Sequence, residues 1–153
     1  MYTYIRKVQY HETDKMGIVH HSNYIRWMEE ARIAYLDELG CGFDKMEADG
    51  LISPVTGVNC TYKTPCTFGD TVAIRVKLTE YSGVRYAVSY EMYNHTSGQL
   101  LATGRTDHCF TNASGRFFEV RVNNLGDPQF FELGVSDCQN TNFEGIRVGV
   151  RFS

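Results

Sequence analysis

One long amphipathic pattern constrains this chain most, because no other stretch of the sequence has the period of a long α-helix. Between residues 24 and 39, apolar side chains recur every three or four positions, which places them on one face of a helix. Most of the charged side chains in this stretch fall on the other face. The apolar positions that we expect to be buried are Ile25, Met28, Ala31, Tyr35, Leu36 and Leu39.

Both ends of this helix carry sequence signals. Ser22 and Asn23 can each act as the N-cap, because their side chains accept hydrogen bonds from unpaired backbone N–H groups. We therefore expect the helix to begin one or two residues after His21, and Gly40 to end it. The free N–H groups at its start can hold an anion, or a carbonyl oxygen that becomes anionic during a reaction.

The turn before the helix concentrates ionisable and ring-bearing side chains. Asp14 is open to two interpretations, a solvated or capping turn residue and a carboxylate that acts as nucleophile or general base. His20 and His21 are adjacent and point apart in most conformations, so they do not form a metal site by themselves. The residues of this group are Tyr10, His11, Glu12, Asp14, His20 and His21.

The rest of the patterned sequence predicts an antiparallel sheet. Apolar and polar residues alternate most clearly over residues 71–80 and 84–93. One helix and one large sheet pack simply if the sheet curls around the helix, so we expect an α+β fold. Uncovered sheet edges then favour a homo-oligomer. We expect strands at residues 2–10, 55–63, 71–80, 84–93, 100–112 and 116–121.

Length and composition narrow the class of protein. The 153 residues suit one domain of ordinary size, and a net charge of −3 gives no reason to expect a nucleic-acid partner. No apolar run approaches the roughly 20 residues needed to cross a bilayer. The first residues lack the apolar segment of a signal peptide, so we expect a cytoplasmic protein. The five cysteines lack zinc-ligand spacing, and we expect free thiols and no metal.

The pattern weakens towards the end of the chain. We assign residues 1–122 to one domain and residues 123–153 to a C-terminal extension of uncertain order. Two polar, glycine-containing stretches occupy most of this extension. Residues 146–153 suit either a terminal strand or a loose tail.

The polar turn and the helix together resemble the signature of the 4-hydroxybenzoyl-CoA thioesterase family of hotdog-fold proteins. The resemblance is closest to the short-chain acyl-CoA thioesterase branch associated with the Tol–Pal cell-envelope system, and it covers roughly residues 3–118. The first motif is long and fairly specific, whereas two later motifs support it. The matching motifs are Tyr10-x-x-x-Asp14-x-x-Gly17-Ile18-Val19-His20-His21-x-x-Tyr24 with Trp27-x-x-Glu30-Ala31-Arg32, Tyr62-x-x-Pro65-x-x-x-Gly69-Asp70, and Ala102-x-Gly104-x-Thr106-x-His108.

The resemblance implies a hotdog fold, in which a curved antiparallel sheet wraps one long helix, and a dimer or tetramer. It also implies hydrolysis of the thioester of acyl-coenzyme A to free acid and CoA, with no cofactor. Asp14 would be the catalytic nucleophile or general base, and Tyr10 and His21 would orient the carboxylate, the substrate or the water. Backbone N–H groups near Asn23 and Tyr24 would hold the carbonyl oxygen.

Substrate contacts are less specific in the sequence. Trp27 can line an acyl pocket or belong to the core. CoA carries phosphates, so basic side chains are expected at the mouth of the site, and each candidate suits a solvated surface equally well. These candidates are Lys63, Arg85 and Arg105.

Two other functions stay open. A hotdog dehydratase or hydratase acting on acyl thioesters would need a histidine and a helix acid, for which His21 with Glu29 or Glu30 is a poor match. A protein that binds acyl-CoA or serves as a scaffold would keep the fold without the activity. The presence of Asp14 weighs against this non-catalytic alternative.

Overall fold

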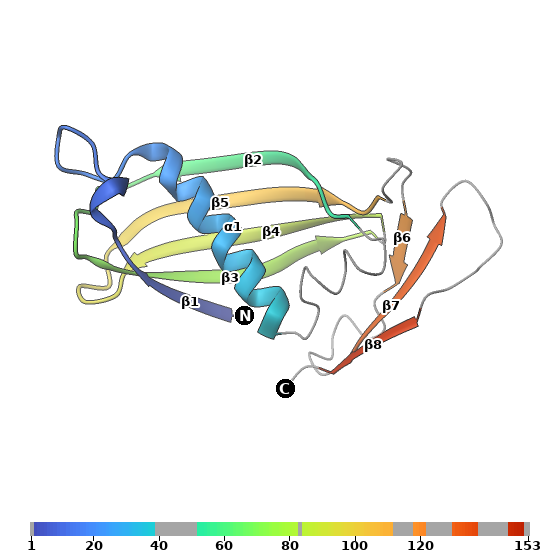
Figure 1. Cartoon of the computed structure of the whole chain (residues 1–153). Coiled ribbons are helices and arrows are strands. Elements are labelled where there is room, and N and C mark those ends of the chain that lie inside the picture. The colour runs from blue at the N-terminus through green and yellow to red at the C-terminus, as the bar shows by residue number, and fades with distance from the viewer. Residues whose placement is uncertain are drawn as a thin grey trace. The chain divides into compact units, whose positions relative to one another are not determined.

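The fold is seen in a computed structural model of the whole chain, which describes residues 2–38, 52–82, 84–111, 118–121, 130–137 and 147–151. One long helix and eight strands account for most of the described residues (Figure 1). In chain order the elements are β1 (Tyr2–Lys7), the 3₁₀ helix η1 (Tyr10–Glu12), α1 (His21–Glu38), β2 (Val55–Tyr62), β3 (Thr71–Tyr81), β4 (Arg85–Asn94), β5 (Leu100–Cys109), β6 (Phe118–Arg121), β7 (Phe130–Asp137) and β8 (Arg147–Arg151).

Five strands form one curved antiparallel sheet in the order β1-β3-β4-β5-β2, and α1 runs across its face (Figure 1). The first and third strands pair antiparallel from Tyr2↔Val76 to Lys7↔Thr71. The two edges of the sheet are therefore β1 and β2. One helix on a curved antiparallel sheet confirms the predicted α+β hotdog architecture.

The core lies between the helix and the sheet. On the sheet side it consists of the buried side chains of alternating strand residues. Val72, Ile74 and Val76 on β3 are fully buried, as the alternating pattern predicted. Arg75 and Lys77, which alternate with them, are exposed. The alternating set predicted for β4 is also confirmed. Its buried members are Tyr86, Val88, Tyr90 and Met92.

The buried stripe of α1 differs in phase from the prediction. Tyr24, Trp27, Met28 and Ala31 are buried, whereas Ile25 is 41% exposed, so its assignment to the core was wrong. Successive helical residues are about 100° apart, and the stripe is centred on the positions next to Ile25. Spacing alone therefore identified the period of the face but not its centre.

Some predicted boundaries also change. The first strand ends at Lys7 and the chain turns into η1, so Tyr10 does not extend that strand and is 77% exposed. A strand at Phe130–Asp137 was missed because its sequence does not alternate clearly. For the end of the chain, the strand alternative is correct at Arg147–Arg151. The loop expected at residues 41–50 lies outside the described residues.

The chain groups into two compact units. The last three strands form a separate antiparallel sheet in the order β6-β7-β8. The predicted domain boundary at residue 122 falls outside the described residues and stays a prediction. The first unit contains Met1–Tyr35, Gly57–Thr79 and Val88–Thr106, and the second contains Leu36–Thr56, Glu80–Ala87 and Asp107–Ser153.

Candidate active site

The Asp14 loop, defined here as residues 13–19, is closed on itself directly before α1. The Asp14 N–H donates to Ile18 O at 2.9 Å, and the Gly17 N–H donates to Asp14 O at 3.0 Å. Gly17 has a φ of 79°, a left-handed conformation that glycine adopts without steric cost. Thr13 and Val19 form an isolated bridge at the base of the loop. These contacts give Asp14 a defined backbone position.

Asp14 is half-buried as a residue, and its carboxylate is oriented by the loop itself. Its Oδ1 accepts a hydrogen bond from the Met16 N–H at 2.8 Å, which is the local turn contact that aspartate favours. This contact matches the capping interpretation of Asp14, and it also holds the carboxylate in one direction. Neither Tyr10 nor His21 hydrogen-bonds to Asp14, and all three residues lie within the described part of the chain.

The helix begins at His21, earlier than predicted, because His20 rather than Ser22 or Asn23 caps it. The Ser22 N–H donates to His20 Nδ1 at 3.3 Å, and the Asn23 N–H donates to His20 O at 3.0 Å. The Asn23 N–H predicted to hold the carbonyl oxygen therefore already has a partner. Tyr24 is the fourth helical residue, where an N–H ordinarily bonds within the helix, and the first orphan N–H belongs to His21.

The two predicted accessory residues contact different aromatic rings. The Tyr10 ring packs edge-on against Phe68, with centroids 5.6 Å apart. The His21 ring lies 4.1 Å from the His20 ring and 6.3 Å from that of Tyr62. The Tyr62 hydroxyl donates to His21 O at 3.1 Å, so the start of α1 is attached to the edge strand β2. Both accessory roles stay predictions.

The aromatic residues of the first helical turns are buried in this chain. Trp27 is fully buried, and its Nε1 donates to Glu12 Oε2 at 2.6 Å. The Tyr24 hydroxyl lies 3.4 Å from Cys66 Sγ. Burial raises the pKa of Tyr24, and the hydrogen bond with Cys66 raises it further. Burial also raises the pKa of the Cys66 thiol, so this cysteine is protonated at neutral pH and is not an activated nucleophile.

The three basic candidates for the CoA phosphates lie on different elements. Lys63 is exposed just after β2, and its N–H donates to Leu101 O at 2.8 Å. Arg105 is half-buried on β5. Arg85 is exposed at the start of β4, in the second unit. Their predicted role stays a prediction.

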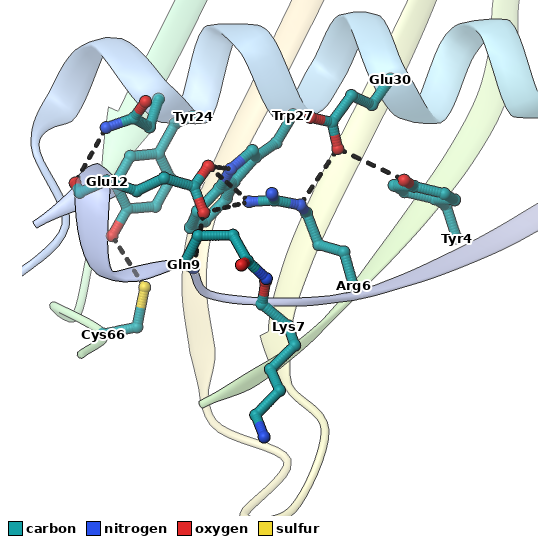
Figure 2. Close-up of polar contacts among 10 residues, drawn as sticks. Tyr4, Arg6, Lys7, Gln9, Glu12, Tyr24, Trp27, Glu30 and Cys66 are labelled. Atoms are coloured by element: carbon teal, nitrogen blue, oxygen red, sulfur yellow. Dashed lines mark hydrogen bonds and ion pairs between the residues drawn. The ribbon is translucent and has the colours of Figure 1, made fainter. Parts of the chain in front are cut away.

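A cluster around the buried Glu12 carboxylate, which was not predicted from the sequence, joins β1, η1 and α1 (Figure 2). Glu12 is 4% exposed. Its two carboxylate oxygens each accept a hydrogen bond from Arg6 Nη1, at 2.8 and 2.7 Å. It also accepts the Trp27 Nε1–H and, at 2.8 Å, the Gln9 N–H. Arg6 Nε contacts Glu30 at 3.0 Å, and the guanidinium carbon lies 4.7 Å from the centre of the Trp27 ring.

Opposing effects set the pKa of Glu12. Burial by itself raises this pKa, because a charged carboxylate is poorly solvated in the core. Hydrogen bonds from Arg6, Trp27 and the Gln9 N–H, together with the Arg6 charge, stabilise the ionised form and hold the pKa below its ordinary value. The sequence contained one signal for this cluster, since Arg6 falls on the inward face of β1 and needs a buried anionic partner.

Within residues 2–38, 52–82 and 84–111 and the three later strands, no group of three or more His, Cys, Asp or Glu side chains is placed to hold a metal ion. Over the same ranges, no helix is long and apolar enough to cross a membrane.

Comparisons with known proteins identify the family of this chain. A sequence profile of the thioesterase-like superfamily matches residues 8–143. A Bacillus subtilis protein named "Putative acyl-CoA thioesterase YneP" is 38% identical over 67% of this chain and 73% of its own length. A 1,4-dihydroxy-2-naphthoyl-CoA hydrolase of Thermosynechococcus vestitus is 28% identical over 69% of this chain and 72% of its own length.

A solved structure supports the same assignment. The DHNA-CoA thioesterase of Staphylococcus aureus superposes with a TM-score of 0.73 at 34% identity, covering 76% of this chain and 78% of that protein. The similarity therefore extends from the sequence motifs to the arrangement of the helix and the sheet. Together these findings show that the chain belongs to the thioesterase-like superfamily of hotdog-fold proteins.

Proposed function

We propose that this chain hydrolyses acyl-CoA thioesters, with the Asp14 carboxylate as nucleophile or general base. The observation that carries the proposal is the placement of Asp14, in a closed loop whose end is the start of α1. A carboxylate and a helix N-terminus then lie within one short segment of chain. The names of the relatives support the same reaction class.

The reaction needs few parts because a thioester carbonyl is already electrophilic. Asp14 either attacks the carbonyl carbon and expels the CoA thiolate, leaving an acyl–aspartyl anhydride that water hydrolyses, or takes a proton from a water that attacks this carbon as the CoA thiolate leaves. The oxygen that becomes negative is held by N–H groups at the start of α1, of which the His21 N–H is the first without an ordinary intrahelical partner. The Asn23 and Tyr24 N–H groups, predicted for this role, lie deeper in the first turn.

The class of acyl group is a further part of the proposal. Two of the relatives are named for an aromatic substrate, 1,4-dihydroxy-2-naphthoyl-CoA. We infer that this chain accepts aromatic acyl groups as well as aliphatic ones. The assignment to the short-chain branch associated with Tol–Pal stays a prediction, and a substrate panel separates the two. Lys63, Arg85 and Arg105 are retained as candidates for the CoA phosphates.

We also propose that the chain forms a homo-oligomer, in which another copy covers an exposed edge of the sheet. The edge strand β2 exposes Val58 by 45% and Tyr62 by 46%. Apolar side chains on an open sheet edge favour pairing with another chain, and a second copy is the simplest partner.

The free thiols of Cys60, Cys66 and Cys109 support a reducing compartment such as the cytoplasm.

Release of free CoA from a panel of acyl-CoAs tests the function. The panel contains short aliphatic, long aliphatic and aromatic thioesters, each incubated with the wild type, Asp14→Asn and Asp37→Asn. Asp37 is an exposed aspartate on α1 and serves as the matched control. We expect CoA release by the wild type and Asp37→Asn, and a loss of at least about 100-fold in Asp14→Asn.

Three results would contradict the proposal. Full turnover by Asp14→Asn would remove Asp14 from the mechanism. Binding of acyl-CoA without CoA release by any protein would favour the non-catalytic alternative, and addition of water to an enoyl thioester without CoA release would favour the hydratase.

A further inference from the structure

Glu12 is hydrogen-bonded through both its backbone and its side chain, and each end joins a different part of the fold. Its carbonyl oxygen accepts the His20 N–H at 2.9 Å and the Asn23 side-chain amide at 2.9 Å. Its carboxylate accepts bonds from Arg6 on β1 and from Trp27 on α1 (Figure 2). One residue therefore connects the first strand, the 3₁₀ turn and the start of the helix.

These bonds close the Asp14 loop at its base. Glu12 directly precedes the loop and His20 directly follows it, and the 2.9 Å bond joins the two. On the far side, the Val19 N–H donates to Cys66 O at 2.9 Å. The position of Asp14 relative to the N-terminus of α1 is thus set by where Glu12 is held.

The chemistry of the cluster favours a role in orienting side chains over a role in stabilising the fold. A buried ion pair gives little net stabilisation, because removing two charges from water offsets most of their attraction. The Arg6 and Glu12 side chains are only 12% and 5% exposed, so both carry this cost. What the pair does provide is direction, because the planar guanidinium reaches Glu12 through Nη1 and Glu30 through Nε, two donors whose relative orientation is fixed.

We propose that Glu12 is a positioning residue, which holds the Asp14 loop against the start of α1 through its contacts with Arg6, Trp27 and His20. The inference rests on the proposed thioesterase function. Glu12 does not touch the substrate. The Glu12 carboxylate keeps the Asp14 carboxylate and the N–H groups of α1 at a fixed separation. Attack on a bound carbonyl requires this arrangement.

Turnover measured in Glu12→Gln tests this role. Glutamine keeps the shape of the side chain but removes the charge that pairs with Arg6. We expect kcat to fall about 10- to 100-fold, because displacements of about 1 Å have effects of this size, while KM changes less than about threefold. Val76→Ala is the control, since it opens a cavity at a fully buried position on β3, away from the cluster contacts.

The control separates positioning from general destabilisation. Both variants are expected to lower the melting temperature, but only Glu12→Gln should lose kcat at a temperature where both are folded by circular dichroism. If Glu12→Gln does not fold, Arg6→Lys takes its place, because it keeps the charge and loses the two rigidly oriented donors that reach Glu12 and Glu30 together. If neither folds, or if kcat stays within about threefold of the wild type, the cluster is purely structural and the proposal is overturned.

Asp14→Asn in the same assay keeps the two proposals distinguishable. An inactive Asp14→Asn beside a fully active Glu12→Gln overturns only the positioning role. A fully active Asp14→Asn, or a wild type that releases no CoA, overturns the proposed function and the positioning role with it.

Discussion

Substitution of Gly104 by alanine is expected to destabilise the fold, although alanine ordinarily suits a strand better than glycine does. Gly104 lies on β5 under the helix. A Cβ built there would overlap Met28 Sδ and would lie 3.2 Å from Asn59 O. Met28 is fully buried, so its side chain has little room to move away. The absence of a side chain at residue 104 is therefore what lets α1 approach the sheet.

The size of the effect follows from two opposing contributions. Replacing a strand glycine by alanine favours folding by about 0.5–1 kcal/mol through the unfolded chain. Forcing an extra methyl group into a well-packed core costs about 1–3 kcal/mol. We expect the overlap to prevail, with a net loss of about 1–2 kcal/mol. A loss of this size lowers the urea midpoint by about 0.5–1 M for a slope near 2 kcal/mol/M.

Urea unfolding of a double-mutant cycle measures this. Met28→Ala alone is expected to cost about 2–5 kcal/mol, because it leaves a cavity. In the double variant the new methyl group partly fills that cavity, so the two losses should fall short of their sum by at least about 0.5 kcal/mol. All four proteins are compared at one concentration, since association would shift the midpoint. Additive losses, or a Gly104→Ala variant as stable as the wild type, would refute the reasoning.

Four further outcomes are expected. The lowered pKa of Glu12 means that the ionised carboxylate stabilises the fold at pH values above about 4.5, the ordinary pKa of a glutamate. This contribution is lost as the pH falls below 4.5, so the difference in unfolding free energy between wild type and Glu12→Gln in urea should shrink from pH 7 to pH 4. Trp27→Phe removes a 2.6 Å hydrogen bond to a buried carboxylate and should cost about 1.5–3 kcal/mol in the same unfolding assay. Gly17→Ala places a side chain at a φ of 79° and should cost about 1 kcal/mol, with reduced CoA release because the Asp14 loop is distorted. CoA release should continue in EDTA, because the proposed chemistry uses no metal.

Each of these outcomes has a clear opposite. A stability difference that stays constant between pH 7 and pH 4 would mean that Glu12 does not titrate as an ionised, buried group. Wild-type stability in Trp27→Phe would mean that the indole bond is not needed to satisfy Glu12. An unchanged Gly17→Ala would show that the loop tolerates other conformations, and inhibition by EDTA that zinc restores would require a metal in the mechanism.

Local patterns in the sequence determined most of the fold. Apolar spacing of three to four residues predicted α1, and strict alternation predicted the buried faces of β3 and β4. These predictions succeeded because a helix or strand with one buried face must repeat with its own period. The sequence likewise placed Asp14 between the first strand and the start of the helix, since that order is readable from the chain alone.

Only the tertiary structure decided how these elements meet. Ile25 is exposed because the centre of the buried helix face depends on where the sheet contacts it, as at Met28 over Gly104. His20 caps the helix in preference to Ser22, because the bond from its N–H to Glu12 O holds it at the helix start. The partners of Glu12 come from residues up to 15 positions away. Periodicity records which face of an element is buried, whereas phase, capping and polar partners are set by contacts between segments that lie far apart in the chain.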